Sequence, residues 1–279
     1  MREITPKQIT DTVYRLATEA AFELPERVLK ALHRAFEAET GPARTVLQTL
    51  MENARIARQE RIALCQDCGL VVVFARVGRD CHLAGDLYDA INRGVAGAYE
   101  DGYLRKSVLE KPLQRDSNTG DNTPAVVHVE LVDGANIELH LAPKGGGSEN
   151  MSTVDMLVPA VGRDGVVEHI ADHVARAGGK PCPPLIVGIG LGGTMEKATL
   201  LSKWSLMRPL GEPSPDPEVA KLEADILEAV NATGVGPMGL GGKTTALAVH
   251  VEEHPCHIAS LPLAINLQCH AARHKHAVI

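Results

Sequence analysis

The segment Cys65-Gln66-Asp67-Cys68-Gly69 constrains the fold of this chain more than any other stretch. It follows a helical pattern over residues 45–62 and precedes an uninterrupted apolar run over residues 70–75, which predicts a buried strand. Functional groups are held best on rigid elements, and this junction carries a thiol, an amide and a carboxylate on three consecutive residues. We therefore expect the chain to fold around a site at this junction.

Two further cysteines lie in equally unusual surroundings. Cys182 is flanked by prolines in Lys180-Pro181-Cys182-Pro183-Pro184, and Cys269 lies in Asn266-Leu267-Gln268-Cys269-His270. The N-terminus lacks the apolar core of a secretory signal, and no apolar run approaches the roughly 18 residues of a membrane span. We therefore expect a cytoplasmic protein whose six cysteines stay reduced and act as core thiols, metal ligands or nucleophiles.

The net charge of −7 argues against nucleic acid or an anionic membrane surface as the main partner. A small anionic ligand is still compatible with it, because local Arg or Lys side chains can dominate one pocket. The 279 residues suffice for one large domain or two small ones, and we see neither a repeat nor a clear boundary. We expect one domain, 1–279, with a helical cap over 1–62 and an α/β part over 63–279.

The predicted elements make a mixed α/β fold. Thr5-Pro6-Lys7-Gln8 is typical of a capped helix start, and further helices are expected from near Pro25 and Pro42. The remaining expected elements are a helix over 84–104, a hairpin of strands over 125–132 and 136–142, a helix over 165–177, a buried strand over 183–188, a helix from Pro217 to Ala232 and a strand over 244–251.

Three glycine-rich stretches invite functional interpretations. In Lys144-Gly145-Gly146-Gly147-Ser148, consecutive glycines allow amide groups to converge on an anion, and a following helix would add its N-terminus; a plain flexible connection is the alternative. Gly188-x-Gly190-x-x-Gly193 resembles a dinucleotide-binding turn, but no acid ends a second strand about 20 residues on. Gly241-Gly242-Lys243-Thr244 resembles a phosphate loop, but Pro237 stands where that pattern needs glycine.

Cys65-x-x-Cys68 also resembles half of a structural zinc site. Such a site normally has a second pair of cysteines at this spacing, and neither Cys182, Cys256 nor Cys269 has a cysteine two residues away. Structural zinc is therefore the non-enzymatic alternative to a catalytic site.

Taken together, several segments resemble the iron–sulfur hydro-lyases, a family that includes the N-terminal catalytic domain of class I fumarases and the α subunits of two-subunit fumarases and L-tartrate dehydratases. The matching residues are Cys65-Gln66-Asp67, Leu104-Arg105, Asn118-Thr119-Gly120 with Asn122, Lys144 to Ser148 with Asn150, Cys182-Pro183-Pro184, Gly192-Gly193-Thr194, Gly241-Gly242-Lys243 and Cys269. The resemblance extends over about residues 5–275. It implies helices and mixed sheets arranged around an iron–sulfur cluster.

The resemblance implies that Cys65, Cys182 and Cys269 ligate one [4Fe–4S] cluster. Four thiolates would close the cluster for electron transfer, whereas three leave one iron open to act as a Lewis acid on a substrate hydroxyl and carboxylate. Gln66 and Asp67 would lie against the cluster because they follow Cys65, and Asp67 is a candidate acid–base or substrate-orienting group.

The same resemblance assigns the remaining site residues. It implies that Arg105 binds a substrate carboxylate, for which a two-pronged guanidinium is suited, and that Gly147 and Asn150 lie beside the substrate. His257, twelve residues before Cys269, matches a site histidine of the family. The implied reaction is hydration of fumarate to (S)-malate, with dehydration of L(+)-tartrate as the alternative.

This chain departs from the family pattern in three ways. The family usually has Thr where Cys68 stands, so Cys68 could compete as a ligand in a damaged cluster. His270-Ala271-Ala272-Arg273-His274 follows Cys269, which is nearer to the two-subunit branch. The family's second catalytic domain is absent, so the resemblance implies a separate β subunit, in an α2β2 assembly, that supplies the carbon-acid base.

Overall fold

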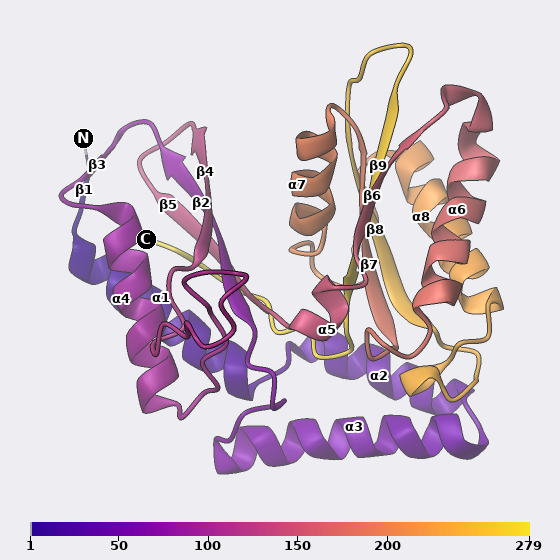
Figure 1. The fold of residues 1–279 in the computed structure, drawn as a ribbon, viewed down its shortest axis with the longest axis horizontal. Coiled ribbons are helices and arrows are strands. Elements are labelled where there is room, and N and C mark those ends of the chain that lie inside the picture. The colour runs from indigo at the N-terminus through magenta and orange to yellow at the C-terminus, as the bar shows by residue number, and fades with distance from the viewer. Residues whose placement is uncertain (1) are drawn as a thin grey trace. The chain divides into compact units, whose positions relative to one another are not determined.

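The apolar strand β2 (Leu70–Gly78) lies at the centre of the first of two units into which the chain divides (Figure 1). The computed structural model describes residues 2–279. Unit 1 comprises residues 2–25, Asn53–Gly146 and Arg273–Ile279, and unit 2 comprises Glu26–Glu52 and Gly147–Ala272. Both units combine helices with a four-stranded mixed sheet, and neither sheet closes into a barrel within residues 2–279, so the expected mixed α/β class is confirmed.

The main sheet of unit 1 has the strand order β10-β5-β2-β4. Its strands besides β2 are β4 (Val126–Val132), β5 (Ile137–Lys144) and β10 (Lys275–Val278), and a separate parallel pair is formed by β1 (Arg2–Ile4) and β3 (Cys81–Leu83). Strand β2 pairs parallel with β4 and antiparallel with β5. The predicted hairpin of residues 125–132 and 136–142 is therefore wrong: β2, whose residues are buried on both faces, lies between the two strands.

Two helices cover one face of this sheet, α1 (Pro6–Phe22) and α4 (Leu87–Asp101) (Figure 1). The predicted capping box is present: the Thr5 hydroxyl accepts the amide of Gln8, and the Gln8 side chain returns to the amide of Thr5. Helix α4 ends earlier than the predicted residue 104. Gly102 and Tyr103, whose φ is 49°, take the backbone out of the helix, so Arg105 lies beyond the last turn.

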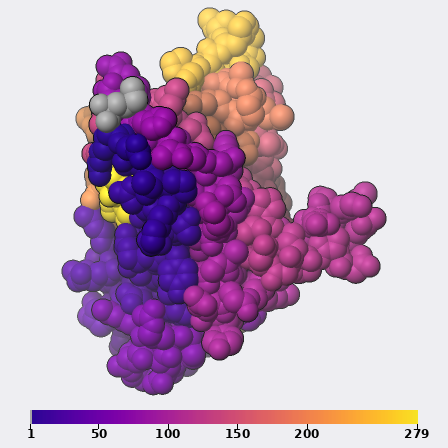
Figure 2. Space-filling model, turned by 90° about the vertical axis from the view of Figure 1, so that its left-hand side faces the viewer, coloured from indigo at the N-terminus to yellow at the C-terminus, as the bar shows by residue number. Residues whose placement is uncertain are grey.

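The connection between α4 and β4 projects from unit 1 as a finger, the magenta segment at the right of Figure 2. Near its end, Leu109 and Asn118 form an isolated antiparallel bridge. The side chain of Leu113 in this connection is 96% exposed, which shows that the finger has no core of its own.

Unit 2 is built on a sheet with the order β6-β9-β7-β8. Its strands are β6 (Thr153–Leu157), β7 (Leu185–Gly192), β8 (Ala246–His254) and β9 (Leu261–Gln268), and its helices are α2 (Glu26–Ala38), α6 (Gly162–Ala177), α7 (Met195–Ser205) and α8 (Pro217–Ala232), with short 3-10 segments at Pro159–Val161 and Pro237–Gly239. Helices α6 and α8 cover one face and α7 covers the other (Figure 1). Helix α3 (Gly41–Glu60) begins in unit 2 and ends in unit 1, and α5 (Gly146–Glu149) is a single turn at the boundary.

The glycines of β7 allow α7 to pack unusually close to the sheet. A Cβ atom on Gly188 would lie 2.2 Å from the carbonyl oxygen of Ser202, and one on Gly190 would lie 1.9 Å from that of Ala198. Both distances are far inside van der Waals contact, so any side chain there would force the helix away. Helix packing thus accounts for the motif that resembles a dinucleotide-binding turn.

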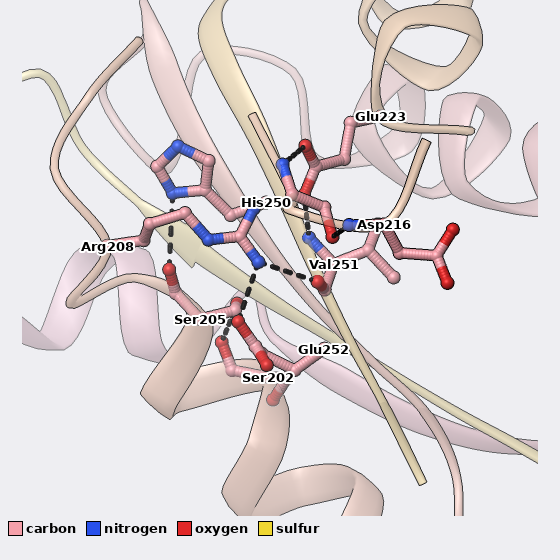
Figure 3. A network of polar contacts seen from close by, with 9 residues as sticks. Ser202, Ser205, Arg208, Asp216, Glu223, His250, Val251 and Glu252 are labelled. Atoms are coloured by element: carbon pink, nitrogen blue, oxygen red, sulfur yellow. Dashed lines mark hydrogen bonds and ion pairs between the residues drawn. The ribbon is translucent and has the colours of Figure 1, made fainter. Parts of the chain in front are cut away.

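A buried ionic network joins α7, α8 and β8 (Figure 3). The guanidinium of Arg208 donates to both Glu223 and Glu252, and to the carbonyl oxygen of Val251 at 2.8 Å. Glu223 is 5% exposed and also accepts the amide of Val251 at 2.8 Å. Beside it, burial and then the nearby Arg208 lower the pKa of His250 to about 4, and its Nδ1 lies 3.1 Å from the carbonyl oxygen of Ser205.

No helix within residues 2–279 combines the length and the apolar character needed to cross a bilayer.

The network in Figure 3 predicts that Glu223→Gln destabilises the protein by about 2–3 kcal/mol, because the largely buried Arg208 would keep only one of its two carboxylate partners, Glu252. Glu228→Gln is the matched control, since Glu228 lies on the exposed face of the same helix and should change stability by about 0.5 kcal/mol or less. Urea unfolding followed by circular dichroism measures both variants. Equal stability of the two variants would show that the network does not stabilise this unit.

Candidate active site

The loop of residues 65–69 in unit 1 is held by contacts to Asp67. Its carboxylate accepts the amide of Gly146 at 2.7 Å and that of Gly69 at 3.0 Å. Its backbone carbonyl accepts a hydrogen bond from the guanidinium of Arg273 at 2.8 Å. The preceding thiol, Cys65, donates to the side-chain oxygen of Gln66 at 3.2 Å. The carboxylate is thus held in place by two amides.

The glycine-rich stretch beside β5 binds an anion, but the anion is the protein's own Asp67. A Cβ atom on Gly145 would lie 3.2 Å from the Asp67 Oδ2 atom, so the backbone approaches closely there. The helix that follows, α5, has only four residues, so the expected contribution of a helix N-terminus is small. In unit 2, Gly147 lies within α5 and within reach of the backbone of Lys180, and Asn150 follows α5 in an exposed turn.

Two of the three predicted cluster ligands lie on neighbouring loops of unit 2. The backbone carbonyl of Cys182 accepts hydrogen bonds from both the amide and the Nδ1 atom of His270, at 3.3 and 3.1 Å. Cys182 has a φ of 58°, a conformation that non-glycine residues rarely adopt and that the surrounding turn must maintain. Because His270 directly follows Cys269, these bonds hold the two cysteine loops side by side.

The three thiols suit a soft metal centre. Cys65, Cys182 and Cys269 are all half-buried, and no disulfide links any of the six cysteines. The side-chain amide of Gln268 donates to the Cys269 sulfur at 3.4 Å, the kind of hydrogen bond that tunes iron–sulfur centres. In residues 2–279, no three His, Cys, Asp or Glu side chains are arranged as a closed metal site. Each of these thiols is thus, in its chemistry, the kind of ligand that iron–sulfur clusters take; Cys65 belongs to unit 1, and Cys182 and Cys269 belong to unit 2.

Cys68 is more deeply buried than these three cysteines. Its side chain belongs to the hydrophobic core of unit 1 and the residue is 3% exposed. Its sulfur accepts the backbone amide of Arg105 at 3.2 Å, and burial raises the pKa of the thiol. A buried thiol directed into the core is unsuited to pair with Cys65 on a shared zinc ion.

Arg105 and His257 lie in different surroundings. The Arg105 side chain is exposed, and its guanidinium makes no hydrogen bond or ion pair with the described residues. His257 is exposed in the connection between β8 and β9, where its Nδ1 accepts the amide of Ala259 at 3.1 Å. It lines a pocket with the start of α7, and that pocket includes neither Cys182 nor Cys269. Within unit 2, therefore, His257 is not brought together with the two cysteines.

The stretch Gly241-Gly242-Lys243-Thr244 already holds an internal anion. The buried carboxylate of Glu39, in the turn after α2, accepts the amides of Lys243 and Thr244, both at 2.6 Å. A strand, β8, follows this stretch, whereas a phosphate loop leads into a helix. Glu39 therefore occupies the amides that a nucleotide phosphate would need.

Three residues that support the loop of residues 65–69 were not assigned a role from the sequence. The hydroxyl of Tyr99 donates to the carbonyl oxygens of Cys68 and Gly69, at 2.7 and 3.2 Å. The side-chain amide of Asn122 donates to the carbonyl oxygen of Gly69 at 3.1 Å. Arg273 completes the set through Asp67. The one signal in the sequence was a tyrosine on the apolar face of a predicted helix, since a buried Tyr hydroxyl usually has a partner.

Comparison with known proteins places this geometry in context. The model of the family described as fumarate hydratase (Fumerase) matches residues 10–278. A Methanocaldococcus jannaschii protein named "Putative L(+)-tartrate dehydratase subunit alpha" is 41% identical over 274 residues, which cover 95% of each chain. Proteins of Escherichia coli strains UTI89 and K12, both named L(+)-tartrate dehydratase subunit alpha, are 29% and 28% identical over 269 residues, covering 95% of this chain and 89% of theirs.

The family match covers both units, including the loop with Asp67 and the two loops joined by His270. The chain therefore belongs to the fumarate hydratase (Fumerase) family of hydro-lyases and is similar over nearly its whole length to α subunits of that family.

Proposed function

We propose that this chain, as one catalytic domain over residues 1–279, is the α subunit of a cytoplasmic [4Fe–4S]-dependent hydro-lyase acting on a four-carbon dicarboxylate. The observation that carries the proposal is the pair of half-buried thiols, Cys182 and Cys269, on loops joined by His270. Reversible hydration of fumarate to (S)-malate is the first candidate reaction. Dehydration of L(+)-tartrate is the second, and the names of the relatives favour it.

Cys65, Cys182 and Cys269 would hold the cluster. A cluster bound through three thiolates supplies an iron with an open position, which can polarise a substrate hydroxyl or carboxylate oxygen. Asp67 lies two residues after Cys65, and its carboxylate is already oriented by the amides of Gly69 and Gly146. It is therefore pre-positioned to orient the substrate or to hold a proton at one of its oxygens.

The other predicted residues would bind and enclose the substrate. Arg105 has an exposed guanidinium without a partner among the described side chains, so it can form a two-pronged pair with a carboxylate. We assign Gln66, Gly147 and Asn150 to substrate contact. His257 would act as a catalytic group at the completed site.

The proposed partner is a β subunit that supplies the base for the carbon-bound proton, in an α2β2 assembly. The α-subunit names of the relatives support a two-subunit enzyme.

We expect the purified α chain, loaded with iron and sulfide, to be inactive alone and to gain activity when the β subunit is added. Comparing kcat/KM for fumarate, (S)-malate and L(+)-tartrate then identifies the substrate. Full turnover by the α chain alone would contradict the proposal.

The ligand assignment predicts different effects for two sets of cysteines. Serine at Cys65, Cys182 or Cys269 should abolish retention of about four iron and four sulfide ions per chain after anaerobic reconstitution. Serine at Cys68, Cys81 or Cys256 should leave iron and sulfide content unchanged, because Cys68 and Cys81 lie in or against the core and Cys256 is exposed and donates to the carbonyl oxygen of Ser260. A stable cluster in Cys182→Ser, or one zinc in place of iron, would overturn the assignment.

Arg105→Lys separates substrate binding from folding. The variant keeps the charge but loses the two-pronged geometry, so kcat/KM of the reconstituted enzyme should fall. The expected loss of transition-state stabilisation is about 2–4 kcal/mol. Iron content and thermal stability should stay unchanged. Arg115→Lys is the matched control, because Arg115 is also exposed in the same connection. Equal activity of the two variants would remove Arg105 from the site.

A further inference from the structure

The sulfur of Cys68 contacts the segment that carries Arg105. The amide nitrogen of Arg105 lies 3.2 Å from the Cys68 Sγ atom, close enough for a hydrogen bond in which sulfur is the acceptor. Cys68 is 3% exposed, and its own weak bond, to the carbonyl oxygen of Cys65 at 3.7 Å, stays within the cysteine loop. One buried side chain thus contacts both the loop that begins with Cys65 and the backbone of Arg105.

The other contacts that hold the backbone of segment 105–107 act at residues beside Arg105. Leu104 is buried in the core of unit 1, which fixes the backbone immediately before Arg105. The amide of Ser107 donates to the side-chain oxygen of Asn122 at 2.7 Å, and the carbonyl of Lys106 accepts from Asn118 at 3.0 Å. Beyond Ser107, the chain continues to the bridge between Leu109 and Asn118. The contact with Cys68 is therefore the one that acts at Arg105 itself.

Arg105 depends on its backbone for orientation. Its guanidinium has no hydrogen bond or ion pair to the described residues, so neighbouring side chains do not direct it. A binding group held by its backbone loses less freedom when a ligand arrives, and this preorganisation appears as affinity. Without the bond to sulfur, the part-buried amide of Arg105 would have only water as a hydrogen-bond partner. The start of the segment would then be less rigidly held.

We infer that Cys68 is a positioning residue for Arg105: its buried sulfur accepts the amide hydrogen of Arg105 and ties the carboxylate-binding segment to the loop of Cys65 and Asp67. The role of the Arg105 guanidinium rests on the proposed function, whereas the contact does not. Cys68 is thereby assigned a role that differs from cluster ligation and from plain core packing.

The decisive comparison is Cys68→Thr against Cys68→Val. Threonine and valine have nearly the same shape, but only threonine offers an oxygen that can accept the amide hydrogen. Hydrogen exchange of the Arg105 amide, measured on the whole α chain, needs neither cluster nor substrate. We expect exchange about tenfold faster in Cys68→Val than in the unmodified chain, and close to the unmodified rate in Cys68→Thr. Equal exchange in the two variants would overturn the contact.

The second measurement is kinetic and uses the reconstituted enzyme with its β subunit. Cys68→Val should raise KM for the dicarboxylate about three- to tenfold with kcat within about twofold, and Cys68→Thr should restore KM. Iron content should be the same in both variants. Cys81→Val and Cys81→Thr serve as controls, because Cys81 packs against the same core but lies on β3.

The outcomes separate the inference from the proposed function. Faster exchange in Cys68→Val without a change in KM, in an enzyme that Arg105→Lys impairs, would overturn the positioning role. If Arg105→Lys has no effect while exchange still distinguishes valine from threonine, the proposed role of Arg105 fails and the contact stands. If Cys68→Val folds poorly, Cys68→Ser and Cys68→Ala give the same comparison with smaller side chains.

Discussion

The carbonyl groups of Cys68 and Gly69 are the constraint on which the site in unit 1 depends. The chain has left α3 and has not yet entered β2, so these carbonyls lie outside the regular helix and the regular sheet. Tyr99 and Asn122 supply the missing donors from α4 and from the connection before β4. The loop is thus held by elements that are distant in sequence, and its conformation is inseparable from the packing of α4 on the sheet.

A different constraint acts in unit 2, where close packing takes the place of polar support. Gly188 and Gly190 let α7 lie against β7 at a distance that excludes any side chain. Cys182 precedes β7 and Cys269 follows β9, and these two strands are adjacent and antiparallel. Their pairing brings the start of β7 beside the end of β9, so the two cysteine loops meet at the same end of these two strands. His270 then fixes that meeting through the carbonyl of Cys182.

Local patterns predicted much of this structure, and non-local pairing accounts for the failure to predict the strand order of unit 1. The capping box at Thr5 and the helix from Pro217 to Ala232 depend on neighbouring residues, and both are present. The hairpin of β4 and β5 was wrong because a strand from earlier in the chain inserts between them. The early end of α4 depends on Tyr103, whose left-handed conformation no sequence pattern indicated. The cluster ligands inferred from the local contexts of the cysteines stay a prediction, whereas Tyr99 acts over a separation that pattern reasoning does not reach.

Arg273 places a positive charge beside the loop of residues 65–69. The net charge of −7 would disfavour a dianionic ligand at long range, so the proposed function requires positive charge close to the site. Arg273 is 2% exposed, forms no ion pair with a carboxylate of the described residues, and leaves its buried Nε atom without a partner. Such a charge costs free energy on folding unless an anion nearby compensates it. Its guanidinium donates to the backbone carbonyl of Asp67. The same loop carries the carboxylate of Asp67 and the thiol of Cys65. In unit 1, the loop of residues 65–69 is therefore the place where an anion would compensate the buried charge of Arg273.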